Sequence, residues 1–122
     1  MRKTWKSLTI TGDENVSAPF EIDSKLKPVH PGAVLRLDFM EPLRLSAIRV
    51  ARACGVPRTR IERVVREETA ISADTALRLA RLFGTSPQFW TNLQTDYDLR
   101  IAAKSARKEL ANIAPITRDA AE

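Results

Sequence analysis

The chain has 122 residues, a formal net charge of +5, an isoelectric point near 9.9 and one cysteine, Cys54. This length predicts a single domain with flanking segments, and one cysteine excludes an internal disulfide, as is typical of the reducing cytoplasm. No apolar run reaches the roughly 18 residues of a membrane span, and no apolar stretch follows the basic N-terminus as in a signal peptide. An aromatic content of 6%, with many Ala, Leu and Arg residues, favours an all-α core.

Residues 1–29 differ from the remainder and are predicted to form an N-terminal arm. Leu8 and Ile10 alternate with threonines, residues 12–15 (GDEN) favour a turn, and further apolar residues surround Pro19. This pattern fits either a weak β-hairpin or a disordered segment that orders on a partner. Because an isolated two-stranded hairpin is only marginally stable in water, we favour the disordered arm.

The compact domain is predicted to span residues 30–103 and to begin with a helix. Pro31 suits the first turn of this helix, and Leu35 and Phe39, four residues apart, share one of its faces. Pro42 is expected to end the helix, because proline lacks the amide proton that a helix interior requires.

Residues 45–66 predict two short helices joined by a tight turn. The small side chain of Ala51 allows the two helices to cross closely, and Gly55 tolerates the positive φ that ends the first of them. Ile61 and Val64 are expected to turn one side of the second helix toward the core. This arrangement is typical of a helix-turn-helix, whose second helix enters the major groove of DNA.

Two further helices are predicted downstream. Ser72 caps the fourth helix and Gly84 ends it, whereas Ser86 and Pro87 begin the fifth. The apolar side of the fourth helix is expected to carry Ala73, Ala76, Leu77, Ala80 and Phe83. The fifth helix carries an apolar residue at every fourth position, in the order Phe89, Leu93, Tyr97 and Ile101. This stripe fits the core or the seam of a homodimer, and we predict that it forms a dimer interface.

Residues 104–122 are predicted to form a C-terminal extension outside the compact domain. The stretch 104–112 has the composition of a frayed amphipathic helix, and residues 114–122 have that of a tail. The expected fold is therefore an all-α, five-helix, repressor-like helix-turn-helix domain with an arm before it and an extension after it.

The second helix of the motif, expected at about residues 57–66, presents the main candidate DNA contacts. Between residues 29 and 103 every cationic side chain is arginine, whose planar fork suits phosphate and guanine edges but also carboxylates of the protein itself. Ser46 is foremost an N-cap, with a hydroxyl that also suits a phosphate. The DNA-binding candidates are Arg58, Thr59, Arg60, Arg63, Arg49, Arg66 and Ser46. The alternative is a solvated face on which these arginines pair with Glu62, Glu67 and Glu68.

The sequence offers no constellation for catalysis or for a metal. His30 is the only histidine, and with Cys54 it cannot complete a zinc site within one chain. There is no phosphate-binding glycine loop, and the carboxylates are scattered. Phe89 and Trp90 fit a stacking platform for single-stranded nucleic acid less well than they fit a core stripe. We therefore expect no enzyme, cofactor, metal or small-molecule substrate.

Five pieces of the chain form a recognisable set: HPGAVL (residues 30–35), EPL (41–43), LS (45–46), GVPRTRI (55–61) and ISADTALRLARLFGTSPQFWTNLQTDYDLR (71–100). The last piece is the most specific, because a generic helix-turn-helix does not need TALRLA, GTSPQFW and NLQ in succession. Together they resemble the phage-repressor-like (XRE) helix-turn-helix domains, and among these the HigA-type antitoxins of bacterial toxin–antitoxin pairs. The similarity covers residues 30–103.

The chain departs from this family's pattern in two helix positions and in its arm. Relatives often carry a glutamine that contacts phosphate directly after the capping serine, where this chain has Ala47. Ile48 follows, at a position that is usually exposed and polar. The arm over residues 1–29 is also longer than a minimal member needs, and its role is open.

The resemblance implies an antitoxin that binds operator DNA as a homodimer, represses its own operon and neutralises a HigB-type, ribosome-dependent mRNA endonuclease. Its expected partners are double-stranded operator DNA, the cognate toxin and a second copy of the chain. No association with a membrane is expected. One alternative is a solitary XRE-family transcriptional regulator that has no toxin partner. Another is a protein-interaction module whose arginine face meets an acidic protein surface instead of DNA.

Overall fold

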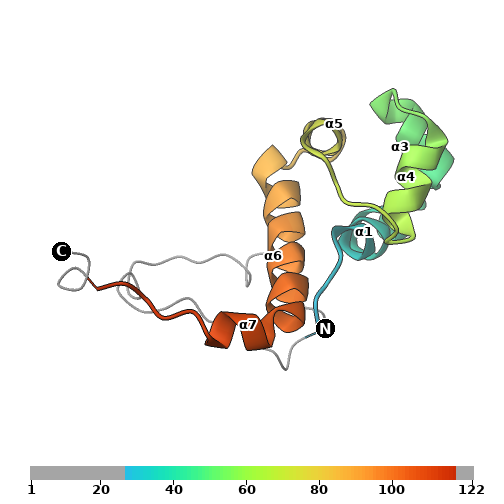
Figure 1. Ribbon diagram of the computed structural model, residues 1–122. Coiled ribbons are helices and arrows are strands. Elements are labelled where there is room, and N and C mark those ends of the chain that lie inside the picture. The colour runs from blue at the N-terminus through green and yellow to red at the C-terminus, as the bar shows by residue number, and fades with distance from the viewer. Residues whose placement is uncertain (1–26, 118–122) are drawn as a thin grey trace.

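The computed structural model describes residues 27–117, and every regular element within that range is a helix (Figure 1). In chain order the elements are α1 (Pro31–Val34), η2 (Leu35–Met40), α2 (Glu41–Leu43), α3 (Ala47–Cys54), α4 (Arg58–Val65), α5 (Ala73–Phe83), α6 (Pro87–Ser105) and α7 (Arg107–Ala111). The expected all-α fold is thus confirmed. Most of the predicted arm and the end of the predicted tail lie outside the described residues, so the choice between hairpin and disorder stays a prediction.

α1, η2 and α2 follow one another without a break and form the predicted first helix, with a π-helical middle. His30 caps its start, because the Nδ1 atom of its ring accepts a hydrogen bond of 2.9 Å from the backbone N–H of Gly32. The prediction that Pro42 ends this helix is wrong by one residue, since the helix continues to Leu43 and is capped by Arg44, which has a φ of 56°. Pro42 comes just after the π-helical turns and lies one residue before the end of the continuous helix.

α3 and α4 form the predicted helix-turn-helix. Ser46 caps α3 by accepting a 3.2 Å hydrogen bond from the N–H of Arg49, and Gly55 ends α3 with a φ of 71°. The N–H of Val56 then donates to the carbonyl of Ala51 across 3.0 Å, which closes the turn before α4. These local signals are confirmed at the predicted positions.

α5 and α6 begin at the predicted serine caps, and α5 ends at Gly84, which has a φ of 72°. The predicted apolar side of α5 is partly wrong: Leu77 is 58% exposed and Ala73 is exposed, whereas Leu79 is fully buried. Leu77 and Leu79 lie about 200° apart around a helix, so only one of them can face the core together with Ala76 and Ala80.

The core is built around the indole of Trp90, which is fully buried. The rings of Phe39 and Phe89 lie 5.1 Å and 4.8 Å from it between centroids, and its Nε1 donates to the hydroxyl of Thr85 across 2.8 Å. Trp90 and Phe89 are therefore core residues, which confirms that interpretation over a stacking platform.

α6 extends beyond the rest of the bundle. Its first half is buried against the core, whereas its second half continues past the other helices. At the C-terminal end of α6 the chain changes direction into α7 (Figure 1). α3 and α4 lie on the side of the bundle away from α6 (Figure 1). None of the helices within residues 27–117 is long and apolar enough to cross a membrane.

Candidate nucleic-acid interface

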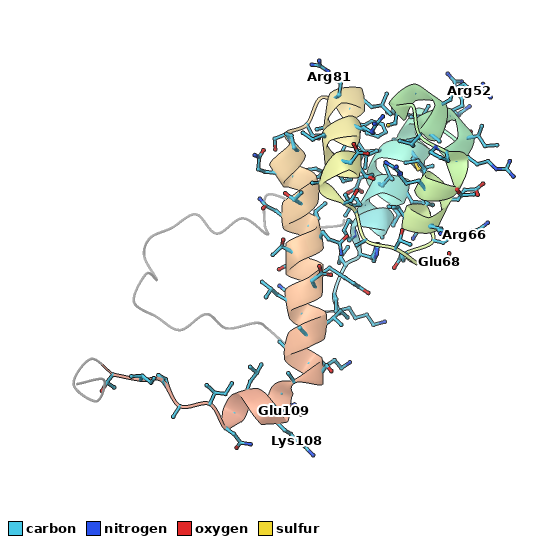
Figure 2. The ribbon with its side chains drawn as sticks, turned by 45° about the horizontal axis from the view of Figure 1, so that its top comes forward. Arg52, Arg66, Glu68, Arg81, Lys108 and Glu109 are labelled. Carbon is cyan, nitrogen blue, oxygen red and sulfur yellow. The ribbon has the colours of Figure 1, made fainter. Side chains whose placement is uncertain are left out.

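The outer surface of α3 and α4 is rich in arginine, whereas the inner side of α4 is apolar and closed. Ile61 and Val64 are each 1% exposed, as the sequence predicts. The predicted contacts on the two helices all lie exposed on the other side, namely Arg49, Arg58, Thr59, Arg60, Arg63 and Arg66. Figure 2 shows Arg52 and Arg66 directed away from the bundle on this side. The surface defined by these exposed residues of α3 and α4 is called the arginine face below.

The N-terminal end of α4 is open. Pro57 occupies the N-cap position and no side chain caps the helix, in contrast to the serine-capped starts of α3, α5 and α6. The positive end of the helix dipole and its first N–H groups therefore face solvent beside Arg58 and Thr59. This is a favourable environment for a phosphate or for the polar edge of a base.

Arg60 is held by a carboxylate on the next helix. Its Nη1 lies 2.5 Å from Oδ2 of Asp74, and the same oxygen accepts from Nε of Arg78 at 2.9 Å. The hydrogen bond from Arg60, followed by the one from Arg78, lowers the pKa of the Asp74 carboxyl below its usual value. Sequence reasoning missed this cluster, although the four-residue spacing of Asp74 and Arg78 on one helix was a readable signal for that part of it.

The other arginines of α4 differ in their partners. Arg58, which is exposed, lies 3.8 Å from the partly buried Glu62 four residues along α4, so the predicted pairing with Glu62 holds for this arginine. Such a pair is weak and is readily exchanged for a phosphate contact. Within residues 27–117, neither Arg63 nor Arg66 makes an ion pair, so the alternative of pairing with Glu67 or Glu68 does not hold for them there.

Arg36 of the first helix holds the C-terminal end of α4. Its Nη1 donates to the carbonyl of Val65 across 2.6 Å, and its Nη2 lies 3.3 Å from Oε2 of Glu67. Glu67 has a φ of 64°, a left-handed conformation that is unusual for a residue with a side chain. Sequence reasoning missed Arg36, because 29 residues separate it from Val65 and no local pattern connects them.

Ser46 fulfils its predicted capping role, because its Oγ accepts from the N–H of Arg49 at the start of α3. Ala47 beside it is partly buried and packs against the core, whereas Ile48 is 41% exposed. The exposed Ile48 therefore lies next to Arg49 at the edge of the arginine face.

The predicted dimer stripe on α6 divides into two parts. Phe89 and Leu93 are 6% and 3% exposed and belong to the chain's own core. Tyr97 is half-buried with its ring 4.9 Å from that of His30, and Ile101 is 44% exposed. Only the second part of the stripe is accessible to another chain.

His30 and Cys54 are both buried, and burial shifts the pKa of each side chain. Burial lowers the pKa of the His30 imidazole, opposed by the charge of Glu67 and by a hydrogen bond to the backbone of Thr69. Burial likewise raises the pKa of the Cys54 thiol, opposed by Arg78, and favours the unreactive protonated form. Among the described residues no three His, Cys, Asp or Glu side chains are grouped so as to hold a metal ion.

The comparisons with known proteins agree with the helix-turn-helix fold. Residues 38–90 match the helix-turn-helix family. The structure of Pseudomonas aeruginosa antitoxin HigA with the higBA promoter is 41% identical, with a TM-score of 0.72, over 75% of this chain and 100% of that one. An addiction module antidote protein of the HigA family from Coxiella burnetii is 37% identical, with a TM-score of 0.70, over 74% of this chain and 99% of that one. Virulence-associated protein I of Dichelobacter nodosus is 42% identical over 97 residues, which are 80% of this chain and 89% of that protein.

The similarity extends well beyond the motif itself, since it covers nearly the full length of each of these relatives. The sequence resemblance of residues 30–103 and the structural similarity therefore indicate the same family. The chain belongs to the HigA-type antitoxins of the phage-repressor-like (XRE) helix-turn-helix family.

Proposed function

We propose that the protein is a sequence-specific DNA-binding antitoxin that represses its own operon as a dimer and neutralises a HigB-type mRNA endonuclease. The observation that carries the DNA-binding part is the arginine face, set on a helix whose other side is sealed by Ile61 and Val64. A solved relative in complex with the higBA promoter supports the same conclusion. The proposed location is the cytoplasm, where both DNA and toxin are found.

The residues of the arginine face take different parts in the proposed DNA complex. Arg58, Thr59 and Arg60 at the open end of α4 read base edges in the major groove. Arg63, Arg66 and Arg49 neutralise phosphates and give the affinity its dependence on salt. Ser46 contributes by fixing the start of α3, which positions Arg49.

The proposed dimer uses the second half of α6. Tyr97 and Ile101, four residues apart, lie there on one side of the helix, and Ile101 is 44% exposed. A symmetric pair of such helices buries this apolar surface. It also presents two α4 helices to half-sites about one helical turn of DNA apart.

The toxin-binding part rests on family membership. The names of the relatives, an antitoxin and an addiction module antidote protein, support a toxin partner for this chain as well. The experiment is co-expression of the tagged chain with the reading frames that flank its gene. Recovery of a small protein that is toxic on its own supports the antitoxin function. Recovery of none, with those frames soluble, favours a solitary transcriptional regulator.

DNA binding is tested by fluorescence anisotropy with a duplex from upstream of the gene and a scrambled duplex of equal length. Arg58→Ala and Arg60→Ala should each weaken binding to the upstream duplex. Lys108→Ala is the matched control, because it removes one positive charge from α7, at the foot of α6 and away from α4 (Figure 2). If both arginine variants keep full affinity, α4 is not the reading helix. If the wild-type chain binds neither duplex at moderate salt, the arginine face serves a protein partner instead.

A further inference from the structure

The first turn of α5 contributes a carboxylate to the arginine face. Asp74 is 54% exposed at its side chain, and its Oδ2 accepts from Arg60 on α4 and from Arg78 one turn along α5. A negative charge in this position opposes the phosphates of any duplex that approaches α4. An aspartate in this position therefore lowers the sequence-independent part of the affinity for DNA.

Arg78 fixes the carboxylate relative to the turn of the motif. Its Nη1 donates to the carbonyl of Cys54 across 2.7 Å, at the end of α3, while its Nε donates to Asp74. The hydrogen bonds therefore run from the α3–α4 turn through Arg78 and Asp74 to Arg60. The position of the Arg60 guanidinium is thus defined by backbone atoms of the motif itself and by α5.

Such a link changes how Arg60 meets DNA. An unrestrained arginine loses the freedom of several side-chain torsions when it docks on a base, whereas a side chain already held in place loses less. Of the five N–H donors of a guanidinium, the contact with Asp74 uses one on Nη1, and donors remain for a guanine edge. The carboxylate also offsets the charge of Arg60, so that this arginine adds less to sequence-independent attraction to phosphate.

We propose that Asp74 is a specificity-determining positioning residue: it holds Arg60 ready for one base pair and weakens binding to every other sequence. This inference rests on the proposed DNA-binding function and adds to it a residue outside the helix-turn-helix. Asp74 acts through Arg60 and does not contact a base.

The test compares wild-type protein with Asp74→Asn on the upstream duplex, on single-base-pair variants of that duplex and on a scrambled duplex, at several salt concentrations. We expect the ratio of specific to scrambled affinity to fall about tenfold, with the loss confined to one base-pair position. Binding to the scrambled duplex should strengthen, and its logarithmic salt dependence should steepen by up to about one unit. An unchanged ratio, or an equal loss on all duplexes, would overturn the proposal.

Two controls separate positioning from charge. Glu68→Gln removes one negative charge at the opposite end of α4 (Figure 2), and it should strengthen binding to all duplexes alike without changing the ratio. If it reduces the ratio as Asp74→Asn does, the effect is one of net charge and the proposal fails. In an Arg60→Ala background, Asp74→Asn should leave the ratio unchanged, because the two residues act as a unit. An additional loss in that background would assign Asp74 an effect of its own and overturn the proposal.

The outcome for the wild-type chain separates this inference from the function on which it rests. If the wild-type chain shows no preference for the upstream duplex, both the proposed DNA-binding function and the role of Asp74 are wrong. If the wild-type chain shows a clear preference and Asp74→Asn retains it, only the role of Asp74 is wrong. Because the Asp74 side chain is exposed, the variant should melt within a few degrees of wild type, and Asp74→Glu, which keeps the carboxylate, should recover part of the ratio.

Discussion

The two ends of α4 are built in opposite ways. At the N-terminal end Pro57 leaves the first turn uncapped, and the side chains of Arg58 and Thr59 are exposed. At the C-terminal end the first helix presses against the backbone, and Arg36 donates to the carbonyl of Val65. From this contrast we infer two tasks under the proposed function: the closed end fixes the direction of the helix, and the open end leaves donors free for DNA. Substitutions at the closed end should therefore change folding, and those at the open end should change DNA binding.

The largest effect is expected from Gly32→Ala at the closed end. A Cβ on Gly32 would lie 1.8 Å from the carbonyl oxygen of Val64, so α1 and α4 would have to separate. We expect a loss of about 3 kcal/mol in the free energy of unfolding, measured by urea denaturation. Gly84→Ala is the control, since nothing lies within 4 Å of its Cβ and only its φ of +72° is strained, at a cost of about 1 kcal/mol. Equal losses in the two variants would contradict close contact between α1 and α4.

At the open end, Arg60→Ala should weaken binding to the upstream duplex by about 2 kcal/mol and relax the preference at one base pair. The midpoint of urea denaturation should stay close to that of the wild type, because the pair with Asp74 is exposed. Anisotropy titrations and urea denaturation of the same preparation provide both values. A variant that lost stability and affinity together would show that the open end also supports the fold.

The two ends also differ in how far they could be predicted from sequence. Ser46 and Gly55 were placed correctly because a cap or a positive φ depends only on neighbouring residues. The contacts of Arg36 with Val65 and of Arg60 with Asp74 join residues 29 and 14 positions apart, and they depend on how the helices cross.

Errors within single helices have a different origin. The sequence ALRLARLF of α5 places apolar residues on two sides of a helix, so it does not by itself distinguish Leu77, which is exposed, from Leu79, which is buried. The missing amide proton of Pro42 predicts a helix end, whereas the π-helical turns that precede it carry no sequence signal that a periodicity argument detects.

Arg36→Ala should produce an intermediate effect at the closed end. It removes a charge-assisted hydrogen bond to Val65 and leaves Glu67, which has a φ of 64°, without its cation. We expect a loss of about 1.5 kcal/mol in the free energy of unfolding, with faster hydrogen exchange at the amides of residues 65–68. Arg44→Ala, at an exposed position on the same first helix, is the control and should leave exchange there unchanged. If the amides of residues 65–68 exchange at the wild-type rate in Arg36→Ala, the contact of α1 alone holds the closed end.

The smallest effect at the closed end is a dependence on pH through His30. Burial lowers the pKa of its imidazole in the folded chain below the ordinary value of 6.5, although Glu67 and Asp98 favour the charged form and offset part of that shift. The unfolded chain therefore binds the proton more tightly, so this contribution to stability is complete above pH 6.5 and is lost as the pH falls through the lowered folded-state value.

His30→Asn tests this dependence without removing the cap, because the asparagine side-chain oxygen also accepts the hydrogen bond from Gly32. The difference in melting temperature between pH 7 and pH 5.5 should shrink in the variant, since that interval lies above the titration of ordinary carboxyls. An equal difference in both proteins would assign the pH dependence to other groups. The affinity for DNA at the open end should respond to this substitution least of all, because the interactions of His30 are with Gly32, with Tyr97 and with the segment after α4.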